Sequence, residues 1–190
     1  MNKKNWMNLP NLLTSIRILL VPVLLAAFFG SPKDRQLPSL IIFLVAGLTD
    51  CIDGYIARKF NQITSLGKIL DPIADKLLTT STLLCLAWLK AINWVALGVI
   101  VVKEMYMAWG AAKCLRRKIT IQADIYGKVA TLLFYPAVIL CWPWHGNLVL
   151  GSIGRVLIYI SLVCSVVAAV HYTIDSVKKW NEIKAGMNAH

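Results

Sequence analysis

Acidic residues are scarce in this sequence. Asp and Glu together number nine in 190 residues, against 20 Lys and Arg, whereas 58% of the residues are hydrophobic and apolar runs recur until about residue 175. This composition is typical of an integral membrane protein. A helix of about 20 residues crosses the hydrocarbon core, so the chain has room for about six or seven spans with short loops. It leaves no room for a separate soluble domain.

Two sequence signals are also missing. The five cysteines are scattered singly with no C-x-x-C spacing, which argues against a zinc or redox site and favours thiols that pack among apolar side chains. No small-residue cleavage site of the A-x-A type follows the first apolar run, which ends near Gly30. We therefore expect that run to be retained as a membrane span.

The net charge of +11 would suggest a nucleic-acid partner for a soluble protein. Here the basic residues lie in short loops between apolar runs, as they do in loops that face anionic lipid, so we expect no nucleic acid. The N-terminus, residues 58–76, residues 113–118 and the C-terminal tail are basic, and the alternate loops carry few such residues. This asymmetry predicts an even number of spans with both termini in the cytoplasm.

The pattern of apolar runs predicts an all-α, polytopic membrane protein that forms a single domain over residues 1–190. A short interfacial helix is expected over residues 6–13, and an aromatic turn at a membrane interface over residues 142–147. Six transmembrane helices are predicted over about residues 14–29, 38–58, 66–89, 94–115, 125–142 and 148–174.

Four of the nine acidic residues gather where the second and third predicted spans meet. The spacing reads D50-x-x-D53-G54-x-x-A57-R58, then eight residues, then G67-x-x-x-D71-x-x-x-D75. Steps of three or four residues return to the same face of a helix, so each helix end presents two carboxylates on one face. The two ends are therefore expected to face one cavity.

Four carboxylates in one cavity repel each other unless they are protonated or neutralised, and hard divalent cations with oxygen ligands are the usual neutraliser. We therefore predict a pair of Mg²⁺ or Mn²⁺ ions, which commonly hold substrate phosphates. Gly54 and Ala57 leave room for a ligand to approach, and Arg58 offers a planar fork to a phosphate. The pattern thus favours a substrate that contains a diphosphate.

Two other interpretations remain open at this point. In the first, the protein is a structural membrane protein whose aspartates lie at interfacial helix ends and pair with neighbouring basic residues. That interpretation predicts no fixed spacing of the aspartates. An ion-coupled transporter also places acids in a membrane. It explains the aspartates but not Gly54, Ala57 and Arg58 beside them.

The pattern from Asp50 to Asp75 matches, at every fixed position, the signature D-x-x-D-G-x-x-A-R-x8-G-x-x-x-D-x-x-x-D, and the chain therefore resembles the CDP-alcohol phosphatidyltransferase family. The resemblance implies that an alcohol attacks the lipid-bearing phosphorus of CDP-diacylglycerol and that CMP leaves, at the cytoplasmic side of a bacterial cell membrane. It also implies roles for individual residues: Asp50, Asp53, Asp71 and Asp75 hold two divalent cations, Asp75 is also the general base, and the CDP site is lined by Gly54, Ala57, Arg58, Gly67 and Thr14.

The alcohol is indicated by other positions. The stretch LPNLLTSIRILLVPV resembles the start of bacterial phosphatidylglycerophosphate synthases, which use glycerol 3-phosphate, with Asn11, Thr14 and Arg17 at matching places. The pairs Lys103-Glu104 and Gly127-Lys128 are similar to an Arg-Glu and a Gly-Lys pair of those enzymes, so Lys103 and Lys128 are candidates to bind the acceptor phosphate.

Two departures affect this acceptor site. Position 103 is Lys instead of Arg, and position 111 is Ala where a second Arg is expected, which leaves Lys113 and Arg116 as candidates to compensate. The alternative within the family is a cardiolipin synthase that uses phosphatidylglycerol, and the residues AGLTD before the signature suit that alternative too. We expect glycerol 3-phosphate as acceptor, and a homodimer, because small intramembrane enzymes often pair.

Overall fold

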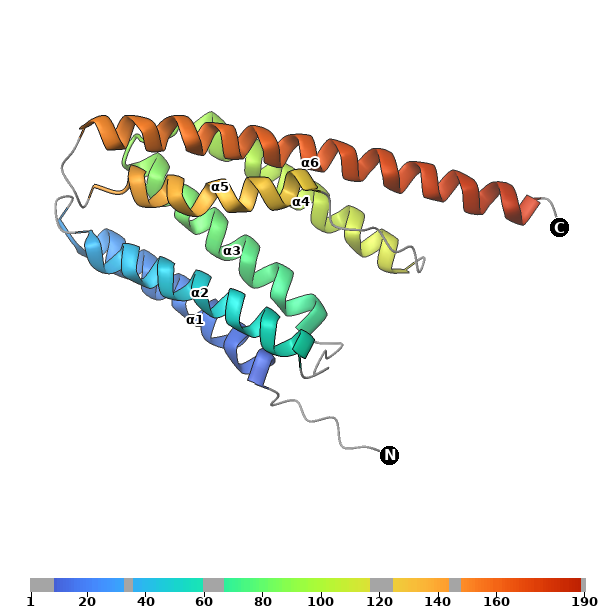
Figure 1. The fold of residues 1–190 in the computed structure, drawn as a ribbon, viewed down its shortest axis with the longest axis horizontal. Coiled ribbons are helices and arrows are strands. Elements are labelled where there is room, and N and C mark those ends of the chain that lie inside the picture. The colour runs from blue at the N-terminus through green and yellow to red at the C-terminus, as the bar shows by residue number, and fades with distance from the viewer. Residues whose placement is uncertain (1–8, 33–35, 60–66, 117–124, 144–147, 189–190) are drawn as a thin grey trace. The chain divides into compact units, whose positions relative to one another are not determined.

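The structure is a computed structural model that describes residues 9–32, 36–59, 67–116, 125–143 and 148–188. Within these ranges the chain forms six α-helices and no strand, so the prediction of an all-α fold is confirmed. The helices, shown in Figure 1, are α1 (Leu9–Gly30), α2 (Leu37–Lys59), α3 (Gly67–Trp88), α4 (Trp94–Arg116), α5 (Ile125–Cys141) and α6 (Leu148–Asn188).

In the part of the chain that the structure describes, three helices contain stretches that are long and apolar enough to cross a membrane, namely Asn11–Gly30, Trp94–Ala111 and Leu148–Trp180. Shorter apolar stretches occupy Leu37–Asp50 of α2 and all of α5. The polar residues of the signature begin at Asp50, in the second half of α2, and side chains of this kind are costly in lipid. These helices agree with the predicted polytopic membrane protein.

Two helix ends differ from the predicted spans. Helix α1 begins at Leu9, so residues 9–13 form its first turns, while the rest of the predicted interfacial helix lies outside the described residues. Helix α6 has 41 residues and continues well past the predicted end at residue 174. At 1.5 Å per residue it is about 60 Å long, roughly twice the thickness of a hydrocarbon core. The apolar run ends near residue 175, but nothing there breaks the helix.

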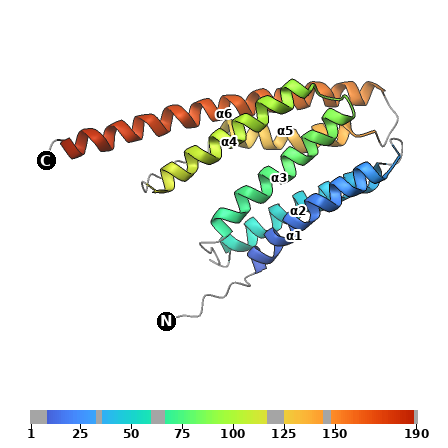
Figure 2. The ribbon, with the colours of Figure 1, turned by 180° about the vertical axis from the view of Figure 1, so that it is seen from behind.

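The chain divides into two compact units: residues 1–90 with 142–147, and residues 91–141 with 148–190. In the first unit, α1 packs against both α2 and α3, as Figures 1 and 2 show from opposite sides. Apolar side chains form its core, and the largest fully buried ones include Leu24, Phe28, Phe43, Leu83 and Leu86. This packing places the polar ends of α2 and α3 next to α1.

Trp142 belongs to the first unit although it follows α5 in sequence. Its side chain is fully buried, its indole Nε1–H donates to the carbonyl oxygen of Gln36 at 2.9 Å, and its ring contacts Phe28 edge to face at 5.6 Å. The first residue of the predicted aromatic turn is therefore a packed core residue rather than an exposed anchor. Residues 144–147 of that turn lie outside the described residues.

In the second unit, α6 packs along α5 and also contacts α4. Gly154 of α6 lies so close to the end of α5 that a Cβ built there would be 2.6 Å from the backbone nitrogen of Cys141. The Ser161 hydroxyl donates to the carbonyl oxygen of Ala130 at 2.8 Å, which adds a polar contact between the same two helices. The absence of a side chain at Gly154 is thus a condition for this close packing.

Lys90, in the turn after α3, adopts a left-handed backbone conformation with φ of 58°. This conformation costs a side-chain-bearing residue more than it costs glycine, so Lys90→Gly is expected to raise stability by up to about 1 kcal/mol. Thermal unfolding of the detergent-solubilised protein measures the change. Lys90→Ala keeps the strained backbone and removes the charge, so it should not be stabilised in the same way; equal gains in both variants would contradict the backbone explanation.

Candidate active site

A fully buried arginine on α1 connects the acidic ends of α2 and α3. The Nη1 atom of Arg17 lies 2.7 Å from Oδ1 of Asp50 on α2 and 3.8 Å from Oδ1 of Asp75 on α3. The Arg17 side chain is 0% exposed, compared with 34% for Asp50 and 54% for Asp75. One guanidinium therefore reaches carboxylates that are distant in sequence and come from two different helices.

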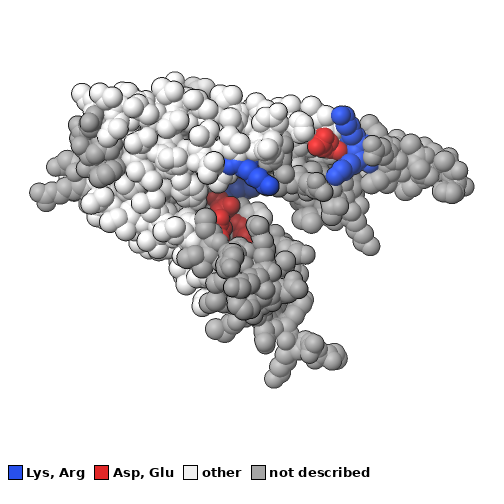
Figure 3. Space-filling model, in the orientation of Figure 1, with Lys and Arg blue, Asp and Glu red and all other residues white. Residues whose placement is uncertain are grey.

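Thr14 lies one turn before Arg17 on the same side of α1, and its buried hydroxyl donates to Oδ1 of Asp71 on α3. Asp71 in turn interacts electrostatically with Asp50. Helix α1 thus contacts three aspartates of the signature. Figure 3 shows two small red patches of acidic atoms, one of which lies over α3 next to a blue patch.

The other predicted residues of this region are only partly described. Asp53, Gly54, Ala57 and Arg58 belong to α2, and Gly67 is the first residue of α3, but their side chains lie outside the described residues. Their predicted positions on shared helix faces follow from the helices themselves. Their roles stay predictions.

The second unit contains a separate polar group between α4 and α6. The Nζ of Lys103 donates to the Ser165 hydroxyl at 2.6 Å and forms an ion pair with Glu104. The side chains of Lys103 and Glu104 are only 14% and 18% exposed. Sequence reasoning selected Lys103 but missed Ser165, because a single serine in an apolar helix carries no distinctive signal. Because Glu104 neutralises the charge of Lys103, the attraction between Lys103 and a phosphate is weakened.

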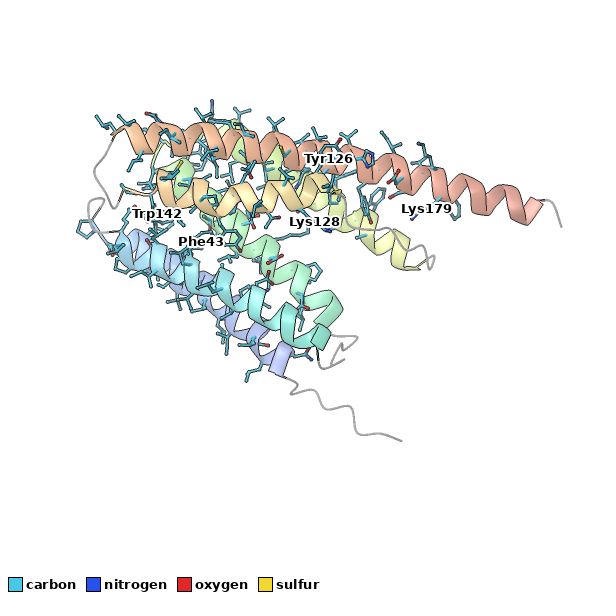
Figure 4. All side chains as sticks on the ribbon, in the orientation of Figure 1. Phe43, Tyr126, Lys128, Trp142 and Lys179 are labelled. Atoms are coloured by element: carbon cyan, nitrogen blue, oxygen red, sulfur yellow. The ribbon has the colours of Figure 1, made fainter. Side chains whose placement is uncertain are left out.

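Lys128 is the more accessible of the two predicted acceptor-binding residues whose side chains the structure describes. It is an exposed side chain in the first turns of α5, on the side of the helix away from Tyr126, as Figure 4 shows. Lys113 and Arg116 lie at the end of α4, and their side chains are outside the described residues. Of the four candidate cations, the structure therefore describes the surroundings of two.

Comparison with known proteins identifies the family. A sequence model of the family described as CDP-alcohol phosphatidyltransferase matches residues 7–167, which is most of the chain. The chain belongs to the CDP-alcohol phosphatidyltransferase family. The resemblance inferred from the signature is thereby confirmed, and this phosphatidyltransferase is a transferase rather than a transporter or a structural protein.

Several relatives of the phosphatidyltransferase are named CDP-diacylglycerol–glycerol-3-phosphate 3-phosphatidyltransferase. The protein from Rickettsia bellii is 34% identical over 179 residues, which cover 94% of each chain. The protein from Aquifex aeolicus is 34% identical over 177 residues, covering 90% of this chain and 97% of its own. The protein from Rickettsia felis is 31% identical over 178 residues, covering 94% of each chain. The similarity therefore extends over nearly the whole length.

The family is generally dependent on divalent metal ions, so the site should offer ligands that suit such ions. Asp50, Asp71 and Asp75 offer only carboxylate oxygens, which are the ligands that Mg²⁺ and Mn²⁺ prefer. Among the described residues no group of three potential ligands is close enough to form a metal site by itself, and the Asp53 side chain is not among them. The chemistry of the donor set fits a divalent ion of this kind.

Proposed function

We propose that this phosphatidyltransferase transfers a phosphatidyl group from CDP-diacylglycerol to glycerol 3-phosphate, giving phosphatidylglycerophosphate and CMP in phospholipid biosynthesis. The observation that carries the proposal is the shared name of relatives that match the chain over nearly its full length. The gathering of signature aspartates around α1 supports the same reaction, because displacement at phosphorus needs concentrated negative ligands for metal ions.

In the proposed site, Asp50, Asp53, Asp71 and Asp75 hold two divalent ions, Mg²⁺ or Mn²⁺. When bound, such ions supply charge neutralisation at the attacking and leaving oxygens of a displacement at phosphorus. Asp75 is the most exposed of the described aspartates, which suits a residue that must also meet the acceptor. Thr14 donates to Asp71 and therefore belongs beside these ligands.

Asp75 serves as the general base in the proposed reaction. Its carboxylate takes the proton of the acceptor hydroxyl, the hydroxyl oxygen forms a bond to the phosphorus that bears the diacylglycerol, and the bond from that phosphorus to CMP breaks. Gly54, Ala57, Arg58 and Gly67 are proposed to line the CDP site, where small side chains admit the nucleotide and the guanidinium pairs with a phosphate. Positioning and charge neutralisation supply most of the rate.

The acceptor phosphate is proposed to meet Lys103, Lys128, Lys113 and Arg116. The exposure of Lys128 makes it the free-standing cation among the two described, since Lys103 is paired with Glu104. Lys128→Ala is expected to raise KM for glycerol 3-phosphate by about 10-fold or more, with a smaller change in kcat. Steady-state kinetics at saturating CDP-diacylglycerol measure this split.

Lys178→Ala is the matched control, because Lys178 is an exposed lysine of α6 that the proposal does not use. Its KM should stay at the wild-type value. A Lys128→Ala enzyme with unchanged KM for glycerol 3-phosphate would remove Lys128 from the acceptor site.

The protein is further proposed to be a multi-pass protein of the bacterial cell membrane, working as a single domain and pairing as a homodimer. The active site and both termini are proposed to face the cytoplasm. The one-sided distribution of Lys and Arg among the loops supports this orientation. Cysteine-labelling at the two termini of intact cells tests it.

The function is tested by incubating the purified protein with CDP-diacylglycerol, Mg²⁺ or Mn²⁺, and either glycerol 3-phosphate or phosphatidylglycerol. Release of CMP together with phosphatidylglycerophosphate is the expected result, and chelation of the metal should stop it. Turnover with phosphatidylglycerol but not with glycerol 3-phosphate would overturn the choice of acceptor, and no CMP release with either would overturn the reaction.

A further inference from the structure

Arg17 is a charged residue that the proposed reaction does not use. It lies in an apolar helix with a fully buried side chain, and an ionised group in such a place is costly unless it is paired. The partners shown for it are Asp50 and Asp75, two of the residues proposed to bind metal. The reason for placing an arginine there is therefore electrostatic.

The charge of the site explains what Arg17 contributes. The carboxylates of Asp50, Asp71 and Asp75 repel one another unless a counter-charge is present, and Arg17 cancels one of these three negative charges from within the protein. The remaining negative charge still favours the binding of divalent cations. Arg17 therefore reduces the repulsion without removing the attraction for metal.

Arginine suits this position better than lysine. Its guanidinium is more weakly hydrated than an ammonium and therefore costs less to bury, and one of its nitrogens, Nη1, faces the carboxylates of both helices. Thr14, one turn away, donates to Asp71 without adding charge. Arg17 thus contacts two of the three aspartates, and Thr14 contacts the third.

We propose that Arg17 is a positioning residue that holds Asp50 and Asp75 toward one another before metal binds, so that the ions enter a site already formed. This inference rests on the proposed role of the aspartates as metal ligands. It gives α1, which carries none of the signature aspartates, a defined part in assembling the metal site.

The test is thermal unfolding of the full-length, detergent-solubilised protein, first with chelator and then with Mg²⁺. Without metal, Arg17→Gln is expected to lower Tm by about 10 °C, because two carboxylates lose a buried partner. Added Mg²⁺ should recover most of that loss, since the ion replaces the missing positive charge. The rise in Tm caused by Mg²⁺ should therefore be larger in Arg17→Gln than in the wild type.

Leu24→Ala is the structural control. Leu24 is a fully buried side chain of the same helix, and because it is uncharged it cannot form an ion pair with a signature aspartate. It should lower Tm equally with and without Mg²⁺. Arg17→Lys keeps the charge and should fall between the wild type and Arg17→Gln without metal; it also serves as the test variant if Arg17→Gln does not fold. In an Asp50→Asn background, the loss caused by Arg17→Gln should shrink.

An Arg17→Gln protein that melts like the wild type without metal would overturn the proposal. A loss of Tm that Mg²⁺ does not recover, and that is unchanged in the Asp50→Asn background, would also overturn it and leave Arg17 an ordinary packing residue. These melting experiments need no substrate, so they stand or fall separately from the identity of the acceptor. If the transfer assay fails while the Mg²⁺-dependent recovery is observed, the proposed reaction is wrong and the role of Arg17 holds.

Discussion

Replacement of Asp75 by asparagine is expected to abolish phosphatidyl transfer, with a loss of at least about 1,000-fold in kcat, because the variant loses both a general base and a metal ligand. Asparagine has nearly the same shape as aspartate but cannot accept the acceptor proton. The fold should survive, since the Asp75 side chain is more than half exposed and lies 3.8 Å from Arg17. Release of CMP from CDP-diacylglycerol measures the loss.

Asp175→Asn is the control for this substitution. Asp175 is an aspartate of α6 that lies 3.7 Å from His171 in the second unit and belongs to no part of the proposed site. It should keep near-normal turnover. Asp75→Asn activity within 10-fold of the wild type would contradict the assigned role.

Gly154→Ala is expected to disrupt the packing of α5 against α6. The added Cβ would lie 2.6 Å from the Cys141 nitrogen, 2.7 Å from the Leu140 carbonyl carbon and 2.8 Å from the Leu140 Cβ. These are largely backbone atoms, so the helices themselves must move apart, at a cost of about 1–3 kcal/mol or more. We expect a lower Tm in detergent and a smaller yield of folded protein.

Gly98→Ala in α4 is a matched control, because nothing lies within 4 Å of the Cβ that it adds. Helix propensity alone then makes this substitution neutral or slightly stabilising. Equal melting temperatures for the two variants would show that the α5–α6 contact is looser than the structure gives.

The helices were largely predictable from the sequence because apolar runs in a membrane protein have a length fixed by the bilayer. The predicted span of residues 38–58 and the helix Leu37–Lys59 differ by a single residue at each end. The exceptions are α1, which begins at Leu9 before the predicted span, and α6, which extends to Asn188. Hydropathy indicates where the lipid-exposed part of a helix ends. The helix itself continues until a turn or a helix-breaking residue ends it, so the two boundaries need not coincide.

The grouping of aspartates was predictable in part. Spacing of three or four residues placed each pair on one helix face, but it could not show which other helix would cover those faces. Arg17 and Thr14 were selected by resemblance, and their contacts with Asp50, Asp75 and Asp71 depend on the tertiary packing of α1. Ser165 was missed for the same reason, since only the approach of α6 to α4 brings it to Lys103.

The burial of Trp142 sets an order on the assembly of this protein during synthesis. The first three helices emerge from the ribosome well before Trp142, yet the carbonyl oxygen of Gln36 and the ring of Phe28 have that indole as a partner. Until α4 and α5 have also been made, the first unit lacks the Trp142 side chain in its core, and the carbonyl oxygen of Gln36 lacks the indole N–H that donates to it. The amino-terminal helices should therefore become resistant to protease only after the fifth helix has been made.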